Sequence, residues 1–398
     1  MSASPLSGLL VVDLSRHLPG PLAARILRDL GARVIKVEEP ELGDPVRNAP
    51  PVRGGTSALA SQLLAGLESI ALDLKKEPAR RVLERLLERA DVLLETFRPG
   101  ALARLGLSPE ELLERYPKLI LCSLSGWGQG GPQSGRAGHD LTYQALAGSL
   151  APTGRMPAAP TADLLGAWSA VSGILATLVG RQRSGRGTHI DAALYDAAGH
   201  GNLIAWAAEA GRPHGVGEPH ALAGALPCYN LYRSRDGGLV ALAALEQKFW
   251  RRFCTALGRE DLMRLQYDES GAAQRKLAVV MSKRTRAEWA EFFAAHDLPG
   301  EPVLAAAEAR AHRQAEVRGL LRTAEDRLPR LAFPALFDGE RPRAPDHVPA
   351  LGEHTDRLLE ELGMAPDSGS RRELRAGGIG PRRSLRRWLW RLAPSLRG

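Results

Sequence analysis

Short apolar runs alternate with longer amphipathic stretches through the first third of the chain. The short runs are typical of buried strands, and they occupy residues 9–14, 34–38, 69–74, 91–95 and 118–124. Between them, apolar residues recur at helical spacing over 20–31 and over 77–90. Strands that alternate with helices in this way predict an α/β fold with a parallel sheet that is covered on both faces.

The pattern changes in the second half of the chain. An apolar stripe from Trp168 to Leu178 predicts a buried helix, which ends at the turn-forming "RSGRG" of 183–187. After a stretch rich in Gly, Pro and His, a strand at 239–245 and helices at 246–257 and 285–296 predict a smaller α/β domain. We therefore expect a large domain over 1–211, a smaller domain over 212–332, a return segment onto the large domain over 333–366, and a tail over 367–398.

The length of 398 residues, of which 44% are hydrophobic, suits a large buried core. The net charge of +8 is concentrated in the tail, where nine arginines face two acidic residues. The nearly neutral body predicts no binding of nucleic acid. The tail is expected to be a disordered extension; the alternative is a basic amphipathic helix that contacts an anionic membrane through Leu385, Trp388, Leu389 and Leu392.

Three dispersed cysteines fit neither a disulfide framework nor a metal site, which favours a reducing compartment and a cytoplasmic location. The ten histidines include no H-E-x-x-H, so a metal site is not expected. No basic segment precedes the first apolar run, which is therefore read as a strand and not as a signal peptide. No apolar run is long enough to predict a membrane span.

Candidate chemistry begins at "GHDLTY" (138–143), which is followed by an isolated aspartate, Asp163, in "PTADLLG". His139 is either half of an acid–base pair with Asp163 or a hydrogen-bonded interior histidine. Near the start, "SRHLPGPLAA" lacks the G-x-G-x-x-G of a dinucleotide site, so Glu38 alone does not predict a nicotinamide cofactor. In "ETFRPGALARLGL", Arg98 and Arg104 near a helix start indicate either a phosphate site or an ordinary turn with solvated arginines.

Six segments, in this order, resemble the family III CoA-transferase superfamily, which contains formyl-CoA and carnitine CoA-transferases and the α-methylacyl-CoA racemases. The resemblance spans roughly residues 6–365 and leaves the tail outside. It implies a large Rossmann-like domain, a smaller α/β domain and an interlocked homodimer with the active site between subunits. The segments are "GARVIKVEEPELGDPVR", "SIALDLK", "ADVLLETFRPGALARLGL", "SGWGQGGP", "GHDLTYQALAGS" and "SGRGTHIDAALYDA".

The resemblance also implies that coenzyme A binds in the first domain as part of an acyl-CoA substrate, with no permanently bound cofactor. The positions that match the family's CoA contacts are Glu39, Leu72, Asp73, Leu74, Lys75, Thr96, Phe97, Arg98, Arg104, Gly138, Asp140 and Leu141.

Both activities of the family use the aspartate that aligns with Asp163. In a transferase it is an ionised nucleophile that forms an acyl anhydride. In a racemase, two groups on opposite faces exchange a proton beside the thioester carbonyl, and the resemblance gives the second role to His139, supported by Glu246 of the partner subunit. Two features favour a transferase instead. Racemases usually have an asparagine four residues before this aspartate, where the chain has Ala159, and "YQALAGS" also matches transferases.

We therefore expect racemisation of 2-methylacyl-CoA thioesters through His139 and Asp163; the alternative is CoA transfer through an acyl anhydride on Asp163. A third possibility is a non-catalytic CoA-binding scaffold, which would need Lys75 and the arginines but not Asp163 or Glu246. Apolar residues after Asp163 suit a hydrophobic acyl chain and, equally, helix packing.

Overall fold

The computed structural model describes residues 4–212, 218–324, 328–342, 345–364 and 376–381. The chain forms two compact units. The first comprises residues 1–147, 159–201 and 317–398, and the second comprises residues 148–158 and 202–316. These units differ from the expected boundaries at 212 and 333, because residues 148–158 and 202–211 belong to the second unit and residues 317–332 belong to the first.

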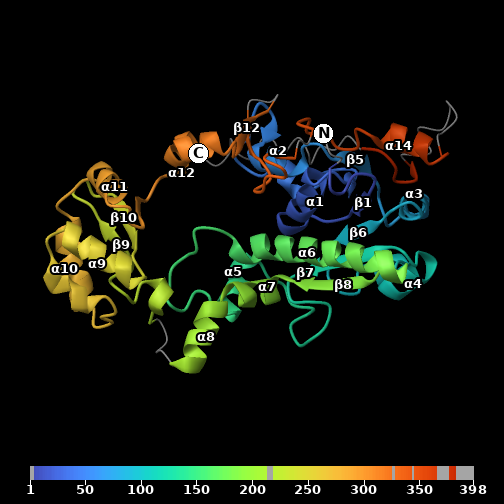
Figure 1. Cartoon of the computed structure of the whole chain (residues 1–398). Coiled ribbons are helices and arrows are strands. Elements are labelled where there is room, and N and C mark those ends of the chain that lie inside the picture. The colour runs from blue at the N-terminus through green and yellow to red at the C-terminus, as the bar shows by residue number, and fades with distance from the viewer. Residues whose placement is uncertain (1–3, 213–217, 325–327, 343–344, 365–375, 382–398) are drawn as a thin grey trace, which may run out of the picture. The chain divides into compact units, whose positions relative to one another are not determined.

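A six-stranded sheet forms the centre of the first unit (Figure 1). Its strand order is β5-β2-β1-β6-β7-β8. Every neighbouring pair is parallel, which confirms the prediction of a parallel sheet. The edge strand β8 was not predicted, because His189 and Asp191 interrupt its apolar pattern. The strands are β1 Leu10–Asp13, β2 Arg33–Glu38, β5 Glu68–Ala71, β6 Val92–Glu95, β7 Ile120–Ser125 and β8 His189–Ala193.

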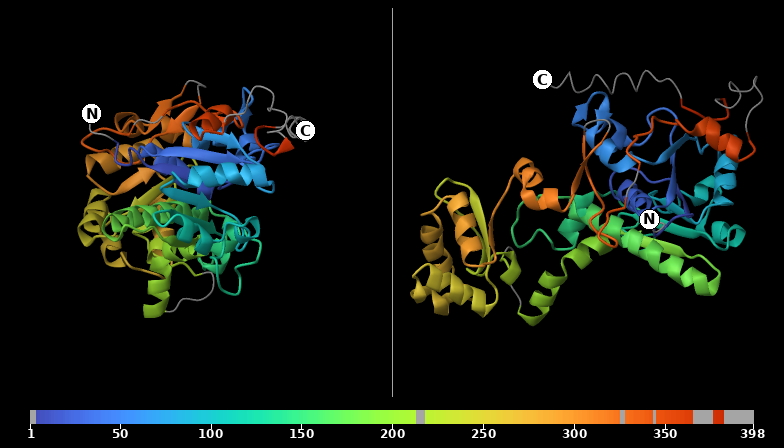
Figure 2. Two further views of the ribbon diagram at one scale, coloured as in Figure 1. Left: turned by 90° about the vertical axis from the view of Figure 1, so that its right-hand side faces the viewer. Right: turned by 45° about the horizontal axis from the view of Figure 1, so that its top comes forward.

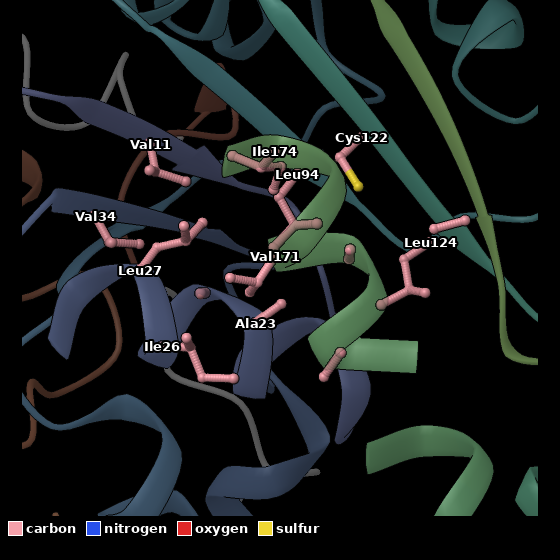
Figure 3. Close-up of a cluster of buried hydrophobic side chains, with 14 of the residues drawn as sticks. Val11, Ala23, Ile26, Leu27, Val34, Leu94, Cys122, Leu124, Val171 and Ile174 are labelled. Atoms are coloured by element: carbon pink, nitrogen blue, oxygen red, sulfur yellow. The ribbon is translucent and has the colours of Figure 1, made fainter. Parts of the chain in front are cut away.

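Helices cover both faces of this sheet, because successive side chains of a strand point to opposite faces. In β2, Val34 packs toward α1, whereas Ile35 packs toward the cluster that contains α3 and α14. The first face carries α1, α2 and α6, and Figure 3 shows its core between α1, α6 and the strands. The helices of this unit are α1 Pro19–Asp29, α2 Ala58–Leu64, α3 Glu77–Leu87, α4 Pro109–Arg115, α5 Asp140–Leu146, α6 Thr161–Ser184, α7 Leu194–Gly201 and α14 Thr355–Glu361.

Helix α6 is long and apolar enough to span a membrane by length and composition alone. Its residues Ala167, Val171 and Ile174 are nevertheless buried in the core. Figure 3 shows Val171 and Ile174 between the sheet and α1. A helix with one face in a hydrophobic core has a packing partner within the protein, so one face of α6 packs within this unit.

Residues from the end of the chain lie against the edge strand β5 (Figures 1 and 2). The backbone N–H of Ser69 donates to His354 Nδ1 at 3.0 Å. The backbone N–H of His354 donates to the Ser69 carbonyl at 2.9 Å. Residues 376–381 also pair with the end of β5. The expectation of disorder throughout 367–398 is therefore wrong for these six residues, because Ile379 gains a buried apolar site there. The proposed amphipathic helix around 385–392 lies outside the described residues.

The second unit has a three-stranded antiparallel sheet in the order β11-β10-β9. Its core is aromatic, with Trp250, Phe253, Trp289 and Phe293 buried together. Its elements are α8 Leu203–Gly211, β9 Tyr229–Arg233, β10 Leu239–Ala243, α9 Gln247–Ala256, α10 Ala272–Met281, α11 Arg286–Ala295, β11 Gly300–Pro302 and α12 Ala306–Ala311. Helix α13 Arg313–Val317 leads back to the hairpin of β12 Leu321–Thr323 and β13 Pro329–Leu331 in the first unit.

Candidate active site

A cavity of about 210 Å³ lies where β1, β2, β5 and β6 end. In open α/β sheets, ligands bind at the carboxyl ends of the strands. Six residues that were predicted to contact CoA line this cavity, and they come from the turns after β2, β5 and β6. They are Glu39, Leu72, Asp73, Leu74, Lys75 and Phe97.

A second cavity of about 510 Å³ lies at the ends of β6, β7 and β8. Both proposed catalytic residues of the first unit, His139 and Asp163, line it. The residues Thr96, Phe97, Arg98 and Gly138, predicted to contact CoA, line it as well. Arg16 and Phe97 line both cavities, so the two cavities adjoin along the same edge of the sheet.

His139 directly precedes α5, at the end of a glycine-rich loop that follows β7. Its N–H donates to Thr142 Oγ1 at 3.1 Å, which fixes the backbone at the helix start. The ring of Tyr143 lies so close to the preceding Gly138 that a Cβ there would meet it at 2.6 Å. Gly138 therefore allows Tyr143 to pack beneath the loop while His139 is exposed to the cavity side of the helix start.

Asp163 lies in the first turn of α6 and is half-buried. Burial raises the pKa of its carboxyl group to about 6, and the nearby charge of Asp140 adds to this effect. A carboxyl group with this pKa exchanges protons readily near neutral pH.

Asp140 was predicted to contact CoA, but it lines neither cavity. Its Oδ1 accepts a hydrogen bond from the backbone N–H of Asp163 at 3.1 Å, and its Oδ2 accepts one from Gln144 Nε2 at 2.6 Å. Asp140 therefore joins α5 to α6 and places a negative charge behind Asp163.

Three other predicted residues also lie outside the two cavities. Arg104 is exposed, and its guanidinium group lies near Gly100. Leu141 is exposed on the first turn of α5. Glu246 is exposed in the second unit, directly before α9, and its pairing with a histidine of another subunit stays a prediction.

Arg16 and His17, on the turn between β1 and α1, line the second cavity but were not predicted as site residues. His17 adopts a left-handed backbone conformation with φ of 71°, which is unusual for a residue other than glycine and often marks a functional site. Its N–H donates to Asp44 Oδ1 at 3.2 Å. Burial lowers the pKa of His17, more than the Asp44 charge raises it. The histidine four residues after the first strand, in "SRHLPG", is a sequence signal that could have indicated this position.

Buried charges hold this turn in place. Lys36 is 1% exposed, and its Nζ lies 3.0 Å from both Asp13 Oδ2 and Asp44 Oδ2. The same group donates to the Ser15 carbonyl at 2.8 Å. The ion pairs thereby connect the ends of β1 and β2 to Asp44, which accepts the N–H of His17.

Glu95 fixes the turn that separates the two cavities. It is buried at the end of β6, and its Oε2 accepts the N–H of Phe97 at 2.6 Å. Burial raises the pKa of Glu95, although hydrogen bonds from Ser123 and Phe97 oppose this effect. Since Phe97 lines both cavities, Glu95 sets the position of a shared wall.

The lining of the second cavity suits a long, polar and anionic ligand. Arg16, Arg98 and Arg136 contribute positive charge. Within the described part of the chain, Ser125 Oγ and Trp127 Nε1 are buried without a hydrogen-bond partner. Unpaired buried donors are costly, and a polar ligand relieves that cost. Both residues belong to the lining of this cavity, so unpaired polar atoms lie in its wall.

Comparisons with known proteins agree on one family. The model of CoA-transferase family III matches residues 6–355. The chain is 35% identical over 376 residues to the alpha-methylacyl-CoA racemase of Homo sapiens, which covers 90% of this chain and 94% of the relative. It is 33% identical over 335 residues to the acetyl-CoA:oxalate CoA-transferase of Acetobacter aceti, covering 80% and 85%. A CAIB/BAIF family protein from Brucella suis superposes with a TM-score of 0.80 at 28% identity, covering 91% of this chain and 100% of that chain.

Proposed function

Since the chain belongs to CoA-transferase family III and is an acyl-CoA-processing enzyme, we propose that it racemises 2-methylacyl-CoA thioesters. The observation that supports this proposal is the pair formed by His139 and Asp163, which line one cavity while the pKa of Asp163 is raised to about 6. The proposal is also supported by 35% identity to a racemase.

The reaction needs two groups that exchange one proton. One group removes the proton from the carbon beside the thioester carbonyl, and the electron pair moves onto the carbonyl oxygen as an enolate. The other group then donates a proton to the opposite face of the same carbon. Asp163 suits either role, because a carboxyl group with a pKa of about 6 populates both protonation states near neutral pH. His139, which lines the same cavity, is proposed as the partner group.

Coenzyme A is proposed as part of the substrate and not as a resident cofactor. Its nucleotide end is assigned to the 210 Å³ cavity that Leu72 and Lys75 line. Its thioester end is assigned to the 510 Å³ cavity with Asp163, and we propose that Arg16, which lines both cavities, contacts a phosphate.

The alternative function is CoA transfer between carboxylic acids. Ala159 supports it, because no asparagine side chain stands four residues before Asp163, as does 33% identity to a transferase. In that reaction, the Asp163 carboxylate attacks the thioester carbon, the CoA thiolate leaves, and an acyl anhydride remains on Asp163.

We further propose that the enzyme is a cytoplasmic, interlocked homodimer in which Glu246 of one subunit supports His139 of the other. The motive is the family membership, together with a return segment that crosses the first unit. A carboxylate on the second ring nitrogen of a histidine fixes its tautomer and raises its basicity.

Deuterium uptake separates the two functions. The enzyme is incubated in D₂O with a chiral 2-methylacyl-CoA and no carboxylic acid acceptor. A racemase places deuterium at C2 and abolishes optical purity. The opposite result, no deuterium uptake together with an acyl group on Asp163 that hydroxylamine traps, would overturn the proposal in favour of the transferase.

A further inference from the structure

The last described residues of the chain pair with the open edge of the central sheet. The segment 376–381, here called the C-terminal strap, follows the end of β5 in antiparallel orientation, with a bridge between Ile379 and Leu72. Gly380 donates its N–H to the Ala71 carbonyl at 2.8 Å, and Asp73 donates its N–H to the Gly378 carbonyl at 2.7 Å. The strap thus supplies backbone partners to the last part of this edge, beyond Ser69, which pairs with His354.

Side chains fasten the strap at both ends. Ile379 is 4% exposed and belongs to the hydrophobic cluster that contains Leu72, Leu358 and Leu359. At the other end of the strap, Lys76 Nζ donates to the Ala376 carbonyl. These contacts join the strap to both the turn after β5 and helix α14.

The fit between the strap and the turn after β5 leaves no room for a side chain at Gly378. This residue has a φ of +82°, and a Cβ there would lie 2.7 Å from the Cβ of Asp73. Only glycine combines that backbone conformation with such a close approach. Gly378 therefore allows the strap to pack closely against the turn that contains Asp73.

The same turn forms a wall of the first cavity. Leu72, Asp73, Leu74 and Lys75 all line it, whereas no residue of the strap does. We infer that the C-terminal strap is a positioning element for the nucleotide end of the substrate: it holds the 72–75 turn from outside, in the conformation that binds the ligand on the inside. This inference rests on the proposal that coenzyme A occupies the cavity.

Loss of the strap is expected to weaken binding without changing the chemistry. Without the strap, the 72–75 turn would have to become ordered when the ligand binds. The free energy of that ordering reduces the affinity. His139 and Asp163 line a different cavity, so the rate at saturating substrate should be retained. The expected signature is a higher KM and Kd for CoA with kcat nearly unchanged.

Two truncations make a matched pair. A chain that stops after Pro381 loses only the arginine-rich end, whereas a chain that stops after Arg375 also loses the strap. By calorimetry, the longer chain should bind CoA and adenosine 3′,5′-bisphosphate as the full chain does. The shorter chain should bind both about tenfold more weakly, which corresponds to roughly 1.4 kcal/mol.

Point variants provide the same test in the full chain. Ile379→Asp should weaken CoA binding as the shorter truncation does, because it places a charge in the apolar site. Ile379→Val should keep the affinity for CoA within about twofold of the native chain. Pantetheine lacks the nucleotide, so its weak binding should be the same in every variant.

Equal CoA affinity of the two truncations would overturn the inference. The inference would also be overturned if loss of the strap lowered kcat and the melting temperature together while the Kd for CoA stayed unchanged. That result would show a purely structural role for the strap. If the full chain itself fails to bind CoA, the proposed function falls and this inference falls with it.

Discussion

Asp140 Oδ1 accepts a 3.1 Å hydrogen bond from the backbone N–H of Asp163, so a second carboxylate stands directly behind the proposed acid–base residue. Neither cavity is lined by Asp140. In the proposed reaction, Asp140 would therefore act indirectly, because its charge raises the pKa of Asp163.

We expect Asp140→Asn to lower the pKa of Asp163, because the amide keeps an acceptor oxygen but removes the negative charge. In the native chain, Asp163 is protonated below a pH of about 6 and ionised above it. Proton removal by Asp163 should therefore speed up as the pH rises through about 6, and the variant should show this rise at lower pH. The pH profile of deuterium uptake measures the change.

Gln144→Leu is the control for that experiment. It removes a neutral donor to Asp140 but keeps the charge, so its profile should shift less than that of Asp140→Asn. A profile that does not move in Asp140→Asn would contradict the electrostatic role of Asp140.

The two proposed catalytic residues should act on opposite faces of the substrate. His139→Ala should slow proton removal from one enantiomer more than from the other, and Asp163→Asn should show the reverse preference. Losses of general acid–base catalysis are typically about 10²–10⁴-fold. Rates of deuterium uptake from each pure enantiomer provide the measurement, and equal losses for both enantiomers in both variants would argue against two bases.

Arginines that line the second cavity should contribute more to CoA affinity than those outside it. Arg16→Ala and Arg98→Ala should each weaken CoA binding roughly tenfold, since a hydrogen bond to a charged group is worth about 1.5–3 kcal/mol. Arg104→Ala should have a smaller effect, because Arg104 lines neither cavity. Calorimetric Kd values for the three variants decide this, and the largest loss at Arg104 would contradict the assignment.

Lys36→Met should destabilise the protein strongly, because it leaves Asp13 and Asp44 buried without a positive partner. The expected cost is about 3–5 kcal/mol in the free energy of unfolding. Arg85→Ala breaks an ion pair with Glu88 whose side chains are 58% and 47% exposed, so it should cost less than about 1 kcal/mol. Urea titrations compare the two, and similar costs would show that the Lys36 ion pairs contribute little.

Complementation tests the proposed dimer. His139→Ala and Glu246→Ala should each abolish most activity in the homodimer. If each site uses His139 of one subunit and Glu246 of the other, a heterodimer of the two variants has one site with both residues intact. Co-expression should then restore up to about half of the native activity per heterodimer, whereas sites formed within one chain would show no recovery.

The elements of the central sheet could be predicted from the sequence because their signal is local. The run at 9–14 and the helix at 77–90 carry their periodicity within a single element, and the structure has β1 at Leu10–Asp13 and α3 at Glu77–Leu87. The family could also be recognised, because its six segments lie in order along the chain. The resemblance also grouped Leu72–Lys75 as contacts of one ligand, and all four line one cavity.

Contacts between distant segments were decided by the tertiary structure alone. Asp140 and Asp163 belong to different helices, and only the packing of α5 against α6 brings the Asp163 N–H to the Asp140 carboxylate. Ile379 finds its site on Leu72, about 300 residues earlier, because the chain returns to the edge of β5. Side-chain type and spacing specify which residues prefer burial, whereas the partner of each buried group depends on non-local pairing that no single stretch encodes.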